Sequence, residues 1–277
     1  LGYALDKAIP LPGLARLSAQ VLRTGQEHTT EISPESGEEQ ILGVFAAPVT
    51  DRPGAPHGVM LVLHDLTEAQ RTERIRREFV ANASHELRTP IAAIKIMVES
   101  LLDGAQEDPP TRTRFLNLVD READRLTHLV TDLLDLSQMD SGQWPLEPEE
   151  FPLREVVDGV VAKFALVAAE RHQRVTGRCP DGVWVRADPR AVNQILGNLV
   201  SNAIRYTPNG GEIRIDAEAE EGFARIRVRD TGIGIPEDAR ERIFERFYRV
   251  DKARSRELGG TGLGLAIVKH LVEALSG

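Results

Sequence analysis

The sequence lacks the features of disulfide-bonded, cysteine-metal and membrane-spanning chains. Cys179 is the single cysteine among 277 residues, so neither an internal disulfide nor a multi-cysteine metal site can form, and a reducing cytoplasm is the expected compartment. No stretch approaches the roughly 18 consecutive apolar residues that a membrane-spanning helix needs. The net charge is -9 and no basic stripe overrides it. Binding to a nucleic-acid backbone is therefore not expected, because such binding needs a basic face.

The chain starts at Leu1 rather than Met, and no charged-then-apolar leader follows. We therefore expect a fragment whose missing upstream part could include a membrane anchor. The composition, 41% hydrophobic and 28% charged, is that of a globular protein. The length allows two or three compact modules rather than one.

Apolar residues recur in steps of three and four over residues 66–102 and again from Phe115 to Leu136. This spacing predicts two long helices, and the break at residues 103–110 makes them an antiparallel hairpin. A hairpin alone leaves an apolar seam in water. Pairing with a second copy would bury that seam in a four-helix bundle, so we expect a homodimer.

Two modules flank the hairpin. Short β-type runs at residues 41–47 and 59–64, separated by the turn-rich residues 51–58, predict a small sheet. After a Gly- and Pro-containing linker at 141–148, helices and strands alternate without a regular βαβ repeat, which favours a two-layer α+β sandwich. In this third module the expected helices span 153–170 and 189–204, and the expected strands span 183–186, 212–217 and 223–229.

The first candidate site lies inside the first long helix, where residues 84–90 read SHELRTP. The neutral imidazole of His85 is a competent nucleophile near neutral pH, and Glu86 could orient the ring or take its proton. Thr89 shares the face of His85, whereas Glu86 points roughly 100° away around the helix. Pro90 should kink the helix one turn beyond His85. Taken alone, a helical histidine is more often a solvated or packed residue.

The second candidate site is a helix that starts at Asp188 and Pro189. Asn198 and Asn202 lie four residues apart on one face, and their amide oxygens suit Mg²⁺ together with water and phosphate. Two ordinary surface asparagines are an equally good explanation. Nearby, Asp230 ends a strand and opens the run DTGIGIP, which places a carboxylate beside approachable backbone. A plain Asp-Thr-Gly turn is the competing explanation.

Residues 259–264 read GGTGLG and lead directly into an amphipathic helix. Glycines before a helix N-terminus form an anion site from free amides and the helix dipole. The segment lacks both the lysine of a Walker loop and the sixth-position glycine of the dinucleotide fingerprint. Before it, residues 243–249 read IFERFYR and precede the charged residues 251–258, a pattern that predicts a lid.

Together, and in this order, these segments resemble the HisKA-type sensor histidine kinases. The nucleotide-binding domain of that family belongs to the GHKL superfamily of gyrase B, Hsp90 and MutL ATPases. The resemblance implies that His85 is phosphorylated from ATP, that Glu86 assists this step, and that Thr89 positions water for dephosphorylating the partner. It further implies a response regulator, whose aspartate receives the phosphoryl group, as that partner.

The resemblance also implies roles in binding ATP and Mg²⁺. Asn198 and Asn202 would hold Mg²⁺ and phosphates, and Asp230 would bind the adenine amino group. Arg205 stands where the family often has lysine, which keeps the charge in a planar form. The other implied nucleotide contacts are Tyr206 near the base, Gly232 and Gly234 shaping the pocket, Arg249 at the γ-phosphate, and Gly260, Gly262 and Gly264 around the triphosphate.

The implied organisation has four parts. Residues 1–67 would form a partial PAS-like sensor segment, 68–140 the dimerisation and phosphotransfer domain, 141–148 a linker, and 149–277 the ATP-binding domain. Family members continue beyond the position of Gly277 into a closing strand pair, so we expect that domain to be incomplete at its C-terminal end.

Two other functions compete with the kinase. A GHKL-type ATPase would share the asparagine and glycine segments but has no need of the motif from His85 to Pro90. A nonenzymatic sensing scaffold would not need Asn202, Asp230 and the glycines intact, and a nucleotide-binding assay would distinguish it. The sequence leaves open whether each chain phosphorylates its own histidine or that of its partner.

Overall fold

The computed structural model describes residues 11, 13–33, 40–50, 56–251 and 260–277. The chain divides into two compact units, Leu1–Ala81 and Asn82–Gly277. Among the described helices, none combines the length and the apolar character needed to cross a membrane.

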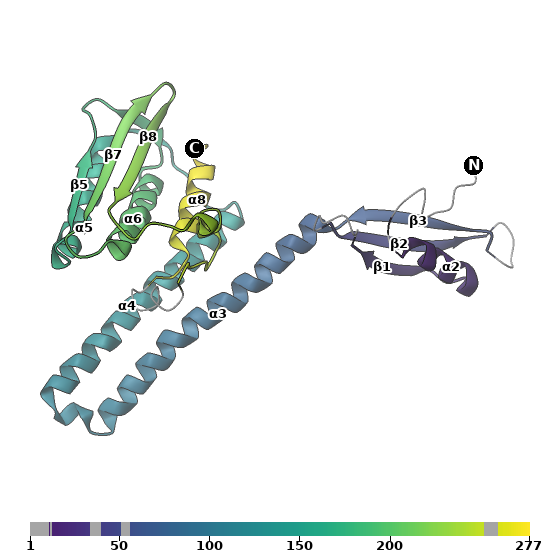
Figure 1. Cartoon of the computed structure of the whole chain (residues 1–277), viewed down its shortest axis with the longest axis horizontal. Coiled ribbons are helices and arrows are strands. Elements are labelled where there is room, and N and C mark those ends of the chain that lie inside the picture. Colours follow the sequence, from purple (N-terminus) through teal and green to yellow (C-terminus); the bar gives the residue numbers. More distant parts are fainter. Residues whose placement is uncertain (1–10, 12, 34–39, 51–55, 252–259) are drawn as a thin grey trace. The chain divides into compact units, whose positions relative to one another are not determined.

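The first unit is a three-stranded antiparallel sheet with one short helix. The helix α2 (Leu14–Thr24) is followed by β1 (His28–Ile32), β2 (Leu42–Val49) and β3 (Gly58–Asp65), which pair in the order β1-β2-β3. Leu14, Leu17 and Val21 of α2 are buried against Val44 and Ala46 of β2, and α2 crosses one face of the sheet (Figure 1). The two predicted strands are present as β2 and β3. Helix α2 and strand β1 were not predicted. Of the predicted turn, residues 51–55 lie outside the described residues.

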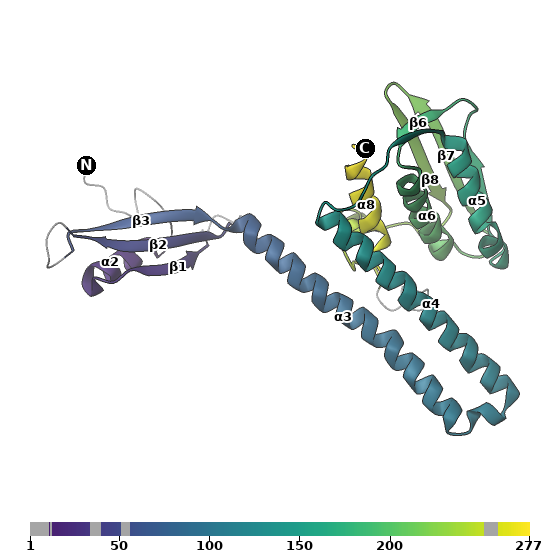
Figure 2. The ribbon, with the colours of Figure 1, turned by 180° about the vertical axis from the view of Figure 1, so that it is seen from behind.

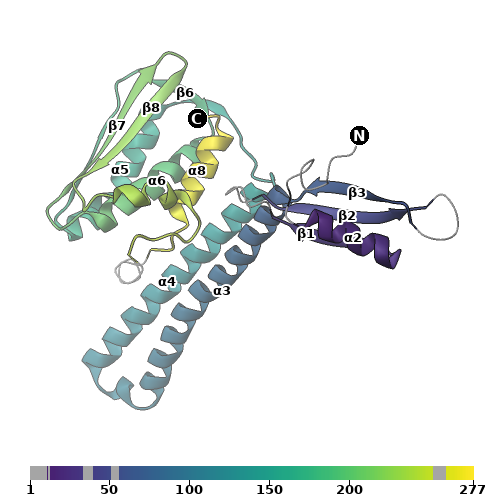
Figure 3. The same ribbon diagram turned by 45° about the vertical axis from the view of Figure 1, so that its right-hand side comes forward.

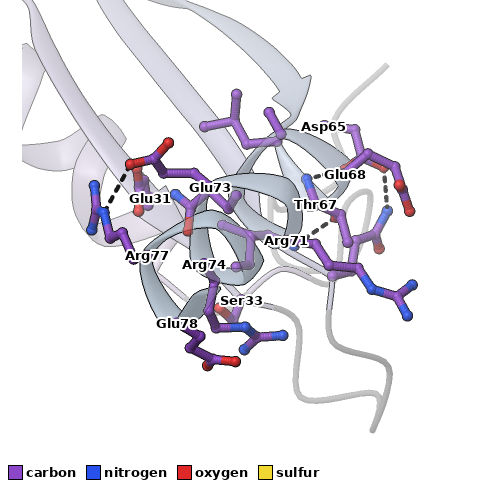
Figure 4. A pocket seen from close by; sticks show the side chains of 15 residues that line it. Glu31, Ser33, Asp65, Thr67, Glu68, Arg71, Glu73, Arg74, Arg77 and Glu78 are labelled. Atoms are coloured by element: carbon purple, nitrogen blue, oxygen red, sulfur yellow. Dashed lines mark hydrogen bonds and ion pairs between the residues drawn. The ribbon is translucent and has the colours of Figure 1, made fainter. Parts of the chain in front are cut away.

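A hollow of about 1350 Å³ lies where this sheet passes into the next helix. Its lining, drawn in Figure 4, mixes acidic side chains such as Glu31 and Glu78 with arginines such as Arg71 and Arg74. Asp65 accepts hydrogen bonds from the Thr67 amide and the Gln40 side chain. The Thr67 hydroxyl first, and then these two hydrogen bonds, lower the pKa of Asp65. Because neither sign of charge dominates, the lining does not indicate a particular ligand.

The predicted hairpin is present. Helix α3 (Thr67–Leu102) is followed by a 3-10 turn, η1 (Ala105–Glu107), and by α4 (Pro109–Asp140). Within the second unit α3 lies beside α4, where Arg125 of α4 contacts Glu86 of α3 (Figure 3). Pro90 lies inside α3, and the helix continues through it. At the start of α4, the Asp108 side chain accepts the Thr111 amide and Pro109 occupies the first turn, as helix N-termini favour.

The remainder of the second unit is the predicted α/β domain. Its elements are β4 (Glu149–Pro152), α5 (Leu153–Glu170), β5 (Arg174–Arg178), β6 (Trp184–Ala187), α6 (Pro189–Tyr206), β7 (Glu212–Glu220), β8 (Phe223–Asp230), the 3-10 turns η2 (Glu237–Ala239) and η3 (Arg242–Phe244), and α8 (Gly264–Ala274). The main sheet has the order β5-β7-β8, with β5 parallel and β8 antiparallel to β7, and β4 pairs with β6 separately. Helices α5 and α6 cover one face of the main sheet (Figures 1 and 2).

The apolar faces of these two helices build the core that positions the site. Leu153 and Val157 of α5 and Leu196 of α6 are buried with Ile213 and Ile215 of β7. Each such side chain contributes about 1.5–3 kcal/mol through burial. The core therefore holds α6 with its polar face turned away from the sheet.

Asp188 fixes where α6 begins. Its side chain, 1% exposed, accepts the backbone amides of Arg190 at 2.8 Å and Glu147 at 3.1 Å. Burial alone would raise the pKa of Asp188, but the hydrogen bonds from the Arg190 guanidinium and then from these backbone amides outweigh it and lower the pKa overall. The predicted N-cap is therefore present, and it also ties the linker to the helix.

Candidate functional site

The two faces of the motif at 84–90 have different surroundings. His85 and Thr89 are exposed, and the Thr89 hydroxyl donates to the His85 carbonyl at 3.3 Å. The Glu86 side chain is 17% exposed and points to a different partner, because Arg249 Nη2 donates to its Oε2 at 2.8 Å. Helical spacing thus leaves the candidate nucleophile accessible and turns the neighbouring carboxylate toward the α/β domain.

A cavity of about 580 Å³ lies between α4, α5, α6 and the glycine-rich segment before α8. Helix α8 packs on both α6 and α4 (Figures 1 and 3). The lining includes most of the predicted nucleotide-binding residues: Asn198, Asn202, Arg205, Tyr206, Arg249, Gly260, Gly262 and Gly264. Segments that are distant in sequence therefore meet at one place.

The charge of this cavity suits an anion. Its lining includes the cationic side chains Arg125, Lys163, Arg190, Arg205 and Arg249. Within the described part of the chain, Asp132 is the sole carboxylate in that lining. Burial lowers the pKa of Arg205 from its ordinary value, but an arginine remains protonated in proteins. The cavity can therefore take a ligand with several negative charges.

Asn198 offers a specific fit for a bound group. Its side-chain nitrogen is buried and has no hydrogen-bond partner among the described residues. A Cβ on Gly264 would lie 3.5 Å from Asn198 Oδ1, so the glycine leaves room at the start of α8. No cluster of three or more His, Cys, Asp or Glu side chains that could hold a metal occurs in the described part of the chain. The amide oxygens of Asn198 and Asn202, both in the cavity lining, are of a kind that can bind a hard cation.

Residues 243–249, the first part of the predicted lid, contact the glycine-rich segment. The Phe247 amide donates to the Gly262 carbonyl at 2.8 Å. Gly262 has a φ of 74°, and a Cβ there would lie 2.9 Å from Phe247 Cα, so a larger residue would clash. Gly259 and residues 252–258 of the predicted lid lie outside the described residues.

Asp230, Gly232 and Gly234 are predicted nucleotide contacts that do not line the cavity. Gly232 lies next to Tyr206, which does line it. Asp230 Oδ1 accepts the Gly232 amide at 2.9 Å, and the Ile233 amide donates to the Tyr206 carbonyl at 3.3 Å. A Cβ on Gly232 would lie 2.8 Å from that carbonyl. The glycine permits this close approach, which holds Asp230 beside the end of α6.

The sequence interpretation missed a row of acids on α4. Thr261 Oγ1 donates to Asp132 at 3.0 Å, Gln194 Nε2 to Asp135 at 2.6 Å, and Arg246 Nη1 to Asp140 at 2.8 Å. With the Glu86–Arg249 ion pair, these contacts join the hairpin to the α/β domain. Acids at positions 132 and 135 share a helix face, and this spacing is the one local signal that could have pointed to them.

Asp132 is an acid whose pKa is raised by its surroundings. Burial, and then the nearby Asp135, raise its pKa to about 6, although Thr261, His128 and Arg205 oppose the shift. Between about pH 4 and pH 6 the unfolded chain releases this proton while the folded chain keeps it. Asp132 therefore makes the folded protein less stable as pH rises through this window, and the penalty is constant above it.

We expect Asp132→Asn to reduce this pH dependence. The amide oxygen can still accept the Thr261 hydroxyl, but the side chain no longer ionises. The fall in Tm between pH 4.5 and pH 7.5 should be smaller in the variant than in the parent, as measured by circular dichroism. Equal falls in Tm would show that Asp132 does not titrate as its burial requires.

Comparison with known proteins gives three family matches. The His Kinase A (phospho-acceptor) domain matches residues 75–142, the histidine kinase-, DNA gyrase B- and HSP90-like ATPase matches residues 187–277, and the PAS fold matches residues 10–71. The sensor histidine kinase WalK of Bacillus subtilis is 40% identical over 87% of this chain and 40% of its own length. Sensor protein kinase WalK of Staphylococcus aureus is 36% identical over 100% of this chain and 68% of its own length.

Solved structures agree with these matches. The Acinetobacter baumannii histidine kinase AdeS is 30% identical with a TM-score of 0.56, over 69% of this chain and 86% of that one. Histidine kinase ThkA, solved in complex with response regulator protein TrrA, has a TM-score of 0.57 over 100% of this chain and 80% of that one. At 24% identity it shows the fold alone.

The chain spans less than half the length of the first curated relatives that it matches. Over that span it has the helical hairpin, the α/β domain and the motifs on which the resemblance was based. The chain belongs to the HisKA-type sensor histidine kinases.

Proposed function

We propose that the chain transfers the γ-phosphoryl group of ATP to His85 and then passes it to an aspartate of a response regulator. The observation that carries this proposal is the ion pair between Glu86 and Arg249. One of these residues adjoins the accessible histidine, and the other lines the basic cavity. The candidate acceptor and the candidate nucleotide site are thus neighbours within one chain.

The chemical step needs little from the protein besides positioning and neutralisation of charge. Neutral His85 attacks the γ-phosphorus, a nitrogen–phosphorus bond forms, and the bond from that phosphorus to the bridging oxygen breaks. ADP is the leaving group. Glu86 accepts the proton that the imidazole releases, once its carboxylate has turned toward the ring. Arg249 then neutralises charge on the transferring group.

The nucleotide contacts follow from the cavity. Asn198 and Asn202 would hold Mg²⁺, which would neutralise phosphate charge, and Asp230 would accept a hydrogen bond from the adenine amino group. Arg205 would bind phosphate through its planar guanidinium. Tyr206 would pack near the base, Gly232 and Gly234 would shape the pocket beside it, and Gly260, Gly262 and Gly264 would surround the triphosphate.

A response regulator is the proposed acceptor, and ThkA was solved with such a protein. Thr89 would orient the water molecule that hydrolyses the partner's phosphoaspartate, releasing inorganic phosphate, after its hydroxyl leaves the His85 carbonyl. The test is a chase. Protein labelled from γ-labelled ATP with Mg²⁺ is mixed with a receiver domain, and the label should move to the receiver's aspartate. Label that never forms, or that remains on the kinase with every receiver tried, would contradict the proposal.

We further propose that two copies pair through the hairpin. Large apolar side chains are exposed along both helices, including Ile96 at 63%, Leu102 at 71% and Leu134 at 59%. A second hairpin would cover them in a four-helix bundle. Leu134→Glu should halve the mass measured by light scattering, because the charge would be buried at the seam. Asp124→Glu, at an exposed polar position of the same helix, should leave the dimer intact. A monomeric parent would contradict the proposal.

A further inference from the structure

A single carboxylate oxygen is shared by two arginines. Glu86 Oε2 accepts Arg249 Nη2 at 2.8 Å and also lies 3.5 Å from Arg125 Nη2. Arg249 belongs to the lid of the α/β domain, whereas Arg125 belongs to α4 of the hairpin that carries Glu86. Arg125 and Glu86 therefore belong to the same helical hairpin, whereas Arg249 belongs to the other domain.

Arg249 is poorly placed to serve Glu86 and a nucleotide together. Its side chain is 5% exposed, and its Nε is buried with no hydrogen-bond partner among the described residues. If Arg249 turns to a phosphate, as the proposed function requires, Glu86 loses its shorter ion pair. Leaving a largely buried carboxylate without a cation is strongly unfavourable.

Arg125 is held where it can replace that partner. Its side chain is 14% exposed, and its Nη1 lies 3.6 Å from Glu122, one helical turn away on α4. Neither contact depends on the lid. Arg125 also lines the cavity, so its charge stays on the side from which the phosphates would approach.

We propose that Arg125 is a positioning residue that keeps the Glu86 carboxylate paired, one position along α3 from His85, while Arg249 is engaged by the nucleotide. The inference rests on the proposed function, because it assigns Arg249 to the nucleotide and Glu86 to the histidine proton. It adds a role for a hairpin residue that contacts Glu86 rather than the histidine.

The test is a double-mutant cycle on the full chain, with the rate of His85 labelling measured at saturating Mg²⁺ and ATP. Arg125→Ala should slow labelling by on the order of tenfold or more, as a misplaced catalytic group does. Arg125→Lys should restore most of the rate. The same Arg125→Ala change should have no effect in a Glu86→Gln background, because nothing then remains to position. Arg121→Ala, at an exposed arginine one turn earlier on α4, should leave the rate unchanged.

A second readout covers the case in which labelling of Glu86→Gln is too slow to measure. Without Arg125, Glu86 should hold Arg249 more firmly, so Arg125→Ala should weaken ATP binding more with Glu86 present than with Gln at that position. Arg125→Ala raises the Kd for ATP by some factor in each background. A factor that is about threefold or more larger with Glu86 than with Gln at position 86 would support the inference. Equal effects in both backgrounds, on labelling and on binding, would overturn it. An unlabelled parent would instead refute the proposed function itself.

Discussion

Asn202→Ala is expected to weaken Mg²⁺-dependent ATP binding by on the order of a hundredfold. Asn202 lies four residues from Asn198 on the cavity side of α6, and its amide oxygen is a proposed Mg²⁺ ligand. Loss of groups that merely support metal ligands costs 10- to 100-fold in metal affinity, so loss of a ligand should reach the upper end of that range.

Calorimetric titration with a nonhydrolysable ATP analogue would measure this loss, with and without Mg²⁺. Asn209→Ala, at an exposed asparagine in the turn after α6, is the matched control and should bind normally. If Asn202 acts through Mg²⁺, the parent and Asn202→Ala should bind the analogue with the same Kd when Mg²⁺ is removed. A variant that binds as well as the parent would exclude Asn202 from the metal site.

Glu86→Gln should change binding and chemistry in opposite directions. Arg249 would lose its charged partner and become free for the nucleotide, so the Kd for ATP should fall. Labelling of His85 at saturating ATP should slow by roughly 10²–10⁴-fold, because general base catalysis typically contributes that factor. A change in binding alone would mean that the carboxylate restrains Arg249 but takes no part in the chemistry.

The matched control for this prediction is Glu99→Gln, a glutamate of α3 whose partner is Lys95 at 3.6 Å on the exposed surface. It makes the same chemical change in the same helix, outside the cavity lining. Both the Kd and the labelling rate should stay at the parent values. An equal response from Glu99→Gln would show that the charge of the hairpin, and not the contact with Arg249, produces the effect.

Periodicity in the sequence was enough to predict the hairpin and the helices beside it. The helix expected at 153–170 coincides with α5, and the strand expected at 223–229 differs from β8 by one residue. Each of these elements buries one face, so its apolar residues recur at a regular spacing from which the element can be predicted. Helix α6 adds capping by Asp188 and Pro189, which marks its start.

Short elements that depend on distant partners could not be predicted in this way. The strand β5 reads RVTGR, has little apolar alternation, and exists through parallel pairing with β7 some 40 residues later. The strand β4 has four residues and ends in Pro152. Their backbone pairing is nonlocal, and no local pattern specifies it.

The candidate site likewise has a part that local segments predict and a part that depends on contacts between distant segments. Asn198, Asn202 and the glycines at 260, 262 and 264 stand in recognisable segments, and the structure brings them to one cavity. The contacts of Asp132 with Thr261 and of Glu86 with Arg249 join residues more than a hundred positions apart. Such contacts depend on how the α/β domain packs on the hairpin, which no segment of the sequence encodes by itself.

The most direct test of the central claim is acid-labile, alkali-stable label from γ-labelled ATP, compared between the parent and His85→Ala. We predict label on the parent, none on His85→Ala, and parent-level label on His172→Ala, which removes an exposed histidine of the α/β domain. Label that survives in His85→Ala, or a parent that binds ATP with Mg²⁺ and remains unlabelled, would contradict the account.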